Sequence, residues 1–100
     1  MYIVTTEFIR PSEDVPYYID TNSVLKSEFL EFISAVGELI TSMDTVNSGT
    51  QQITTVIYPD EDTFNNFMVF FNSTFPTFFE DRDLYCSTNN ITITRTAETI

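Results

Sequence analysis

The chain has 100 residues, of which 42% are hydrophobic and 15% aromatic, and this length suits one compact domain covering residues 1–100. Four basic residues stand against 15 acidic ones, and the resulting formal charge of −11 disfavours direct binding to nucleic acid or to an anionic membrane surface. The absence of His excludes a Ser-His-Asp relay, an imidazole metal site and a histidine-ligated haem.

The first half of the chain predicts a strand, an irregular loop and a long helix. Tyr2–Ile9 is rich in β-branched and aromatic residues and is closed by Pro11, which has no N–H group to donate to a sheet. Pro11–Asp20 contains two prolines and reads as an ordered loop. Apolar residues then recur at helical spacing, which predicts one continuous helix: Leu25, Phe29, Phe32, Ile33, Val36, Leu39, Ile40 and Met43.

A turn signal and a proline bracket the next predicted strand. Asn47, Ser48 and Gly49 favour a turn, and Gln51–Tyr58 follows as a strand that Pro59 ends. A short strand around Asp44–Val46 is expected to pair with it as a hairpin. The hairpin strand before the turn is the least strongly patterned element of the chain.

The second half predicts two helices and a final strand. Acidic residues at 60–62 suit the positive end of a helix, whose apolar positions run from Phe64 to Phe75. Pro76 disfavours helical geometry at Phe75, so this helix is expected to end near Thr74, and a short helix is expected over Pro76–Asp83. Ile91–Ile100 alternates Ile with Thr and predicts the last strand.

The element order β-α-β-β-α-β predicts an α+β domain of the ferredoxin-like type, in which two helices cover one face of a four-stranded antiparallel sheet. The other face also needs a cover. Both side-chain sets of Tyr2–Ile9 are largely uncharged, and Gln51–Tyr58 carries no charge, although the protein as a whole is very acidic. We therefore expect a second copy to pack on this face and form a homodimer.

This arrangement resembles the dimeric α+β barrel superfamily over essentially the whole chain. In composition the chain also resembles small uncharacterised proteins from marine environmental or phage sequences. The resemblance implies sheet-to-sheet pairing around an apolar chamber. Some barrel relatives are cofactor-free monooxygenases and others act on haem, but a chain without His departs from the His-dependent members.

The aromatic residues supply the candidate ligand site. Ten Phe and five Tyr give a core of rigid rings, which either interdigitate completely or leave a gap lined by apolar surface. For such a gap we predict Tyr58 as a polar rim and Arg95 as the anchor for an acidic head group. The predicted helix wall consists of Phe29, Phe32, Phe67, Phe71 and Phe75.

Glu7 is the last candidate site residue. The first and last strands of this fold are antiparallel neighbours, which leads to the hypothesis that Glu7 and Arg95 share a face. There the two side chains either form a cross-strand ion pair or help to hold a ligand.

Two functions of different class follow. The first is a binding module for a small apolar or fatty-acid-like molecule. The alternative is an acidic, phage-related structural or partner-interaction protein, of which a mimic of DNA phosphates is one form. No motif indicates an enzyme, and a cofactor-free monooxygenase is the one enzyme hypothesis retained.

The single cysteine bears on location and chemistry. Cys86 cannot form a disulfide within the chain, and a reducing cytoplasm is the expected location. The acidic residues around Cys86 disfavour a thiolate, so it is expected to be a small buried apolar side chain. The sequence predicts no metal and no cofactor.

Overall fold

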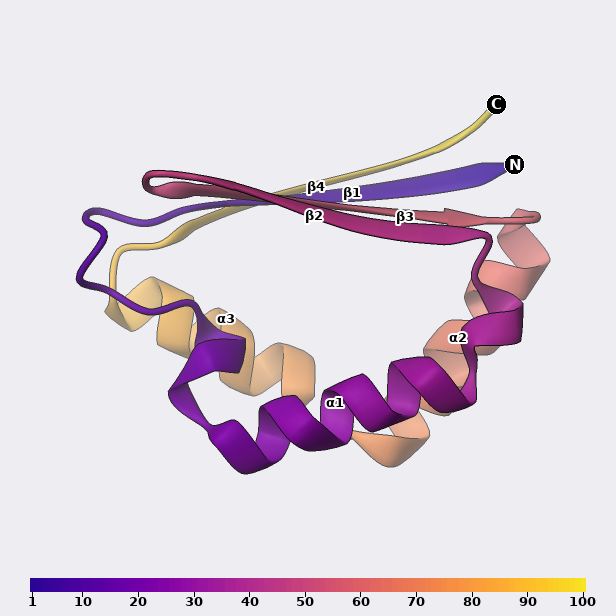
Figure 1. The fold of residues 1–100 in the computed structure, drawn as a ribbon, viewed down its shortest axis with the longest axis horizontal. Helices are drawn as coiled ribbons and strands as arrows, with labels where there is room; N and C mark the ends of the chain where they lie inside the picture. The colour runs from indigo at the N-terminus through magenta and orange to yellow at the C-terminus, as the bar shows by residue number, and fades with distance from the viewer.

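The computed structural model describes residues 1–100, in which a four-stranded antiparallel sheet lies over three helices (Figure 1). The strands are β1 (Tyr2–Ile9), β2 (Ser42–Ser48), β3 (Gln51–Tyr58) and β4 (Thr92–Thr99). The helices are α1 (Ser23–Ala35), α2 (Glu61–Thr74) and α3 (Phe78–Thr88), with short 3-10 turns η1 (Tyr18–Thr21) and η2 (Gly37–Leu39). All three helices lie on the same side of the sheet.

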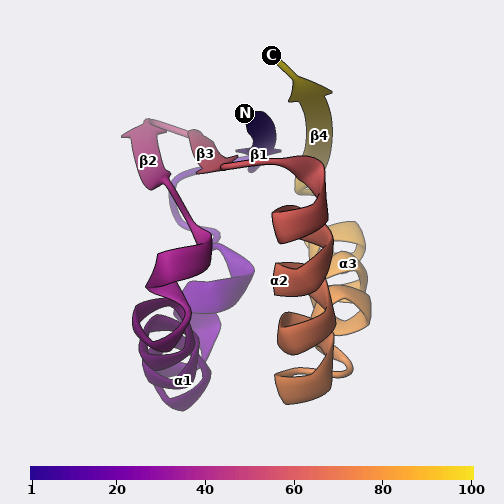
Figure 2. The ribbon, with the colours of Figure 1, turned by 90° about the vertical axis from the view of Figure 1, so that its right-hand side faces the viewer.

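The sheet has the strand order β2-β3-β1-β4, and every neighbouring pair is antiparallel. This topology confirms the predicted ferredoxin-like plan. Figure 2 shows α1 beneath the β2 and β3 side of the sheet, with α2 and α3 beneath the β4 side. Because side chains alternate along a strand, one set of β1 faces the helices and the other set lies on the outer face, which no helix covers.

The first helix is shorter than the predicted one. The expected helix to Met43 ends at Ala35, where Val36 leaves helical geometry and Gly37 opens the 3-10 turn. Gly37 is a helix-termination signal. The apolar spacing continues past Gly37, so the spacing alone does not show where the helix ends. Leu39 and Ile40 still pack against the core, but Met43 belongs to β2.

Two other boundaries differ from the sequence prediction. β2 extends over Ser42–Ser48 because Thr41 and the residues after it pair with β3 up to the turn, so the predicted core of Asp44–Val46 is only its centre. α3 begins at Phe78, after Pro76, and continues past Asp83 to Thr88. It is a full third helix of 11 residues and forms one wall of the space beneath the sheet.

Asp60 caps α2, at the end of the helix where the sequence predicted acidic residues 60–62. Its Oδ1 accepts hydrogen bonds from the backbone N–H and the hydroxyl of Thr63, both at 2.7 Å. These bonds lower the pKa of Asp60 from its ordinary value of 3.8, because they favour the charged carboxylate. Glu61 and Asp62 add negative charge in the first turn, where the helix dipole is positive.

We expect Asp60→Asn to reduce the pH dependence of stability in acid. The folded-state pKa of Asp60 lies below its unfolded value, so its contribution is complete above about pH 4 and is lost as the pH falls through the lowered pKa. Asn also caps helices well but cannot be protonated in this range. The measurement is Tm against pH for both proteins; curves that stay parallel through the acidic range would contradict the assignment.

The core is small and aromatic. Eight residues are buried, and five of them form its centre: Val4, Tyr58, Phe67, Phe71 and Phe75. The Phe71 ring lies 5.1 to 6.1 Å from six other aromatic rings, those of Phe29, Phe32, Phe67, Phe75, Phe78 and Phe79. The rings therefore gather where α1, α2 and α3 meet, and much of the inner face of the sheet is left without close cover from the helices.

Candidate ligand-binding cavity

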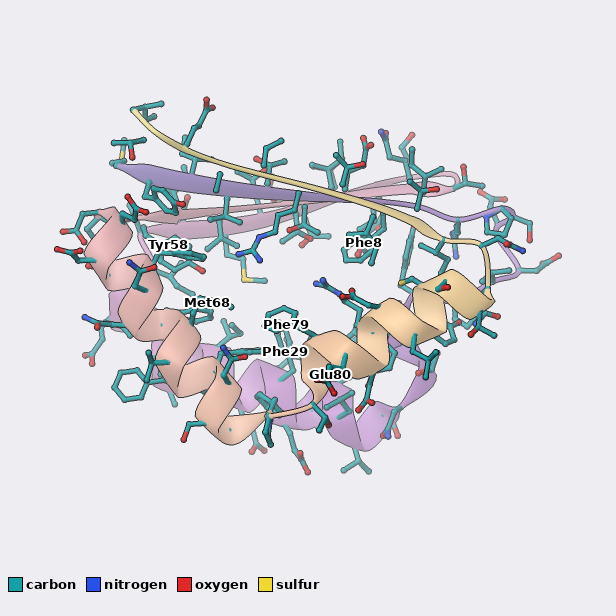
Figure 3. The ribbon with its side chains drawn as sticks, turned by 180° about the vertical axis from the view of Figure 1, so that it is seen from behind. Phe8, Phe29, Tyr58, Met68, Phe79 and Glu80 are labelled. Carbon is teal, nitrogen blue, oxygen red and sulfur yellow. The ribbon has the colours of Figure 1, made fainter.

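A cavity of about 630 Å³ lies between the inner face of the sheet and the helices. It has the size of pockets that bind small molecules, and it far exceeds the voids of ordinary close-packed interiors. Of its 28 lining residues, 18 are hydrophobic. In Figure 3, Phe8 extends from the sheet toward the helices, Phe29 and Phe79 lie across from it, and Tyr58 and Met68 lie toward the α2 end.

Most of the predicted aromatic wall lines this cavity, but two members do not. Phe29, Phe67 and Phe71 line it, as do Tyr58 and Arg95. Phe32 and Phe75 instead line a separate and more open depression between α1 and the end of α2. The centres of the Phe32 and Phe75 rings lie 5.7 Å apart. The two rings pack against the aromatic cluster on the side away from the cavity, and so they support its wall.

The expected shared face of Glu7 and Arg95 is wrong. In the sheet, Arg95 lies opposite Thr6, while Glu7 lies opposite Thr94. Since partners across a ladder share a face and neighbours alternate, Glu7 points to the outer face and Arg95 to the inner one. Glu7 accepts a hydrogen bond of 2.7 Å from Nε2 of Gln51.

All four basic residues of the chain line the cavity: Arg10, Lys26, Arg82 and Arg95. Asp20 is the one carboxylate among the lining residues, although the chain has 15 acidic residues. Asp20 forms an ion pair of 2.7 Å with Lys26 near the solvent. The cavity is thus apolar and cationic inside a protein whose remaining surface is strongly acidic, a contrast that the sequence alone does not reveal.

We use "the Arg95 end" for the part of the cavity formed by Tyr58, Phe64 and Arg95. The Arg95 guanidinium carbon lies 5.6 Å from the centre of the Phe64 ring, and Arg95 takes part in neither of the two salt bridges of the structure. Burial raises the pKa of Tyr58 from 10.0 to about 12, although nearby Arg95 acts in the opposite direction. At neutral pH this end therefore holds a cation beside an uncharged phenol.

We use "the Arg82 end" for the part of the cavity formed by Phe8, Arg10, Tyr17 and Arg82. The Arg82 guanidinium lies 4.9 Å from the Phe79 ring and 5.8 Å from the Phe8 ring, and its one ion-pair partner is the exposed Asp83. None of the four residues was predicted for the site. Arg10 and Arg82 lie 72 positions apart in the chain, and only the fold brings them to one cavity.

Arg10 and Tyr17 come from the loop after β1, which several hydrogen bonds hold in place. Arg10 donates to the carbonyl oxygens of Glu13, Val15 and Gly49 at 2.9 to 3.1 Å and so ties this loop to the β2-β3 turn. The Tyr85 hydroxyl of α3 donates to the carbonyl oxygen of Pro16 at 2.6 Å. The arginine and tyrosine side chains are thus fixed, with the Arg10 guanidinium 4.6 Å from the Tyr17 ring centre.

Cys86 is the buried apolar side chain that the sequence predicted. It is 2% exposed in α3, and burial raises the pKa of its thiol, with Arg82 acting against this and Asp83 adding to it. It does not line the cavity. No three Cys, Asp or Glu side chains come together in a metal-binding arrangement, and no helix has the length and hydropathy to cross a bilayer.

Comparison with known proteins shows similarity at the level of the fold. No family model matches the sequence, and no curated protein matches it significantly. The solved structures do contain similar folds. A dimeric ferredoxin-like protein from an uncultured marine organism aligns over 99% of this chain and 94% of its own, with a TM-score of 0.62 and 14% identity.

A candidate antibiotic biosynthesis monooxygenase from Deinococcus radiodurans aligns over 100% of this chain and 92% of its own. Its TM-score is 0.54 and its identity 8%. The chain has the ferredoxin-like fold. At identities of 14% and 8% the similarity concerns the arrangement of helices and strands. The function of the cavity depends on the residues that line it in this chain.

Proposed function

We propose that this ferredoxin-like protein binds a small, apolar, fatty-acid-like molecule with an anionic group in the cavity beneath its sheet. The observation that carries the proposal is the placement of all four basic side chains around a cavity of about 630 Å³ whose lining is mostly hydrophobic. Apolar walls favour a hydrocarbon chain, and a few fixed cations favour one negative group on it.

Arg95 is the proposed anchor for that group. It lies in the cavity lining without an ion-pair partner, so its planar fork of donors is free to hold a carboxylate in two parallel hydrogen bonds. The neutral phenol of Tyr58 is a hydrogen-bond donor of the same end and cannot repel the anion.

The test is co-purification. We expect native mass spectrometry or solvent extraction of the purified protein to release a fatty acid or similar amphiphile. Arg95→Ala should reduce its affinity about tenfold, because charge-assisted hydrogen bonds to a carboxylate are lost. Arg95→Lys is the matched control: it keeps the charge without the fork and should retain more affinity than Ala.

A purified protein that carries nothing, and whose Tm does not rise when long-chain fatty acids are added in excess, would remove the proposal. Equal affinity in the Ala and Lys variants would remove Arg95 as the anchor.

We also propose a homodimer formed by the outer face of the sheet. The centre of this face carries isoleucines that no helix covers, namely Ile3, Ile53 and Ile57. Glu7 of the central strand β1 also points to this face, where it is hydrogen-bonded to Gln51, and the other charges lie on the edge strands, where Asp44 is opposite Thr55 and Glu98 is opposite Ile3. An apolar centre with a polar rim is the usual composition of a protein interface. The dimeric state of the similar marine protein supports the same assembly.

The acidic exterior supports a second candidate function, binding to a basic partner protein, including a DNA-binding one whose nucleic acid it would imitate. Because all four basic side chains line the cavity, the charged side chains on the other surfaces are carboxylates. Such binding would weaken steeply as salt is added, whereas binding of a buried amphiphile would change little. Pull-down on a basic partner at two salt concentrations separates the two functions.

An enzyme is the third candidate, supported by the similar fold of the candidate monooxygenase. The single lining carboxylate, Asp20, is already paired with Lys26 at 2.7 Å, and Tyr58 keeps its proton at neutral pH. These groups favour holding a ligand over abstracting a proton from it. Demonstrated turnover without an added cofactor would reverse this order.

A further inference from the structure

A row of polar side chains crosses the inner face of the sheet where the sheet lines the cavity. Thr45 of β2 lies opposite Thr54 of β3, and Thr54 lies opposite Thr6 of β1. Thr6 in turn lies opposite Arg95 of β4. Partners across a ladder share a face, and all four residues line the cavity. We use "the threonine row" for Thr45, Thr54 and Thr6, which leads across the sheet to the proposed anchor.

The surroundings of the threonine row are mainly apolar. The next row toward Tyr58 consists of Met43, Val56 and Val4. The helices on the other side of the cavity contribute mostly aromatic and aliphatic side chains, such as those of Phe29, Phe67 and Phe71. On the side of the Arg82 end, the amides of Asn47 and Gln52 are hydrogen-bonded to each other at 2.9 Å. The threonine row is therefore a narrow polar band on the floor of an otherwise hydrophobic space.

The hydroxyl of Thr6 is open to the cavity. It forms no side-chain hydrogen bond within the protein, whereas the hydroxyl oxygens of Thr45 and Thr54 lie 3.2 Å apart and bond to each other. The buried polar side-chain atoms without a partner are Arg10 Nε and the Tyr17 hydroxyl, and no threonine oxygen is among them. Because the Thr6 hydroxyl is unpaired and yet not buried, it keeps accessible surface in the empty cavity. Thr54 is also only half-buried.

A plain hydrocarbon chain matches this band poorly. If such a chain covered Thr6, the hydroxyl would lose its water and gain no hydrogen-bond partner, which costs free energy. A hydroxyl or carbonyl oxygen on the ligand would supply the partner, since a threonine hydroxyl both donates and accepts. A site that hydrogen-bonds a polar group of its ligand discriminates against the analogue that lacks this group.

We propose that the ligand is an oxygenated amphiphile, an anionic molecule whose hydrocarbon part carries a hydroxyl or carbonyl group bound by Thr6 and Thr54. The inference rests on the proposed binding function and specifies its ligand class. Arg95 and Thr6 are partners on neighbouring strands, which lie about 4.8 Å apart. The oxygen atom therefore belongs to the half of the chain nearer to the anionic group.

The experiment compares acids of equal chain length by calorimetric titration of the purified, delipidated protein. The probes are hexadecanoic acid, its 3-, 5- and 7-hydroxy derivatives, and 16-hydroxyhexadecanoic acid as the control with a distant hydroxyl. We expect at least one of the first three hydroxy acids to bind about tenfold more tightly than hexadecanoic acid, because it pairs the open hydroxyl. The 16-hydroxy acid should show no such gain.

Thr6→Val tests the residue, because valine keeps the branched shape and removes the hydroxyl. The preference for the hydroxy acid should shrink in this variant, while the affinity for hexadecanoic acid stays the same or rises. Thr5→Val is the matched control. Thr5 is the adjacent residue of the same strand and lies on the outer face, opposite Thr55 and Thr96, so its substitution should leave the preference unchanged.

Three results would each overturn the oxygenated ligand. They are hydroxy acids that bind no better than hexadecanoic acid, an equal gain for the 16-hydroxy acid, and a preference that survives in both Thr6→Val and Thr54→Val. These results leave the binding function in place if hexadecanoic acid itself binds. Failure of all the acids to bind overturns the binding function and the ligand class together.

Discussion

Phe71→Ala is expected to lower the free energy of unfolding by about 3–5 kcal/mol, the usual cost of removing a large buried aromatic side chain. Phe71 is 3% exposed and its ring lies at the centre of six others, so the rings around it cannot collapse into the space without losing contacts among themselves. In a domain of this size the loss should lower Tm by more than about 10 °C, measured by thermal melting.

Phe70→Ala is the matched control for that variant. The residue is the same type, in the same helix and adjacent, but it is 53% exposed and belongs to none of the ring contacts of Phe71. Its effect should stay within about 0.5 kcal/mol. Equal effects of the two substitutions would mean that α2 is rotated relative to the sheet and that the cavity wall is assigned wrongly.

Ile57→Asp is expected to convert the proposed dimer into a monomer. Ile57 lies opposite Ile3 on the outer face of the sheet, and a two-fold interface brings the same patch of both copies together. Each copy would then bury a carboxylate on apolar surface without a partner, which is costly. The measurement is molar mass by light scattering at micromolar concentration, with circular dichroism to verify that the fold is retained.

Val69→Asp provides the comparison. Val69 is 67% exposed on α2, away from the sheet, so its charge should leave the dimer intact. A parent protein that is already a monomer would remove the dimer proposal, and dissociation by Val69→Asp alone would move the interface to the helices.

Much of the fold could be predicted because its signals are local. The alternating residues of β1 and β3, the acidic start of α2 and Pro76 near the end of α2 each act within a few residues. The end of α1 was missed because Leu39 and Ile40 pack on the same core after the helix stops, so the apolar spacing continues through the break at Gly37.

The site was predictable only in part, for a physical reason. The aromatic positions on the helical stripes identify Phe29, Phe67 and Phe71 as cavity residues. Phe32 faces away from the cavity because of the rotation of α1 about its axis, which depends on how the three helices pack together. Strand register decides the face of Glu7 relative to Arg95, and a shift of one residue reverses it. The cationic Arg82 end joins a loop, a strand and a helix that are distant in sequence, so no local pattern could reveal it.

The burial of Cys86 makes the protein's motions measurable by chemistry. Cys86 is the one thiol of the chain, is 2% exposed and has a raised pKa, so in the closed fold it is shielded from alkylating reagents and is poorly ionised. The thiol becomes accessible when α3 separates locally from its neighbours, so the rate of alkylation measures how often this local opening occurs. Because α3 carries Arg82 and Phe79 into the cavity, a ligand held there would slow the labelling of a cysteine that it never touches.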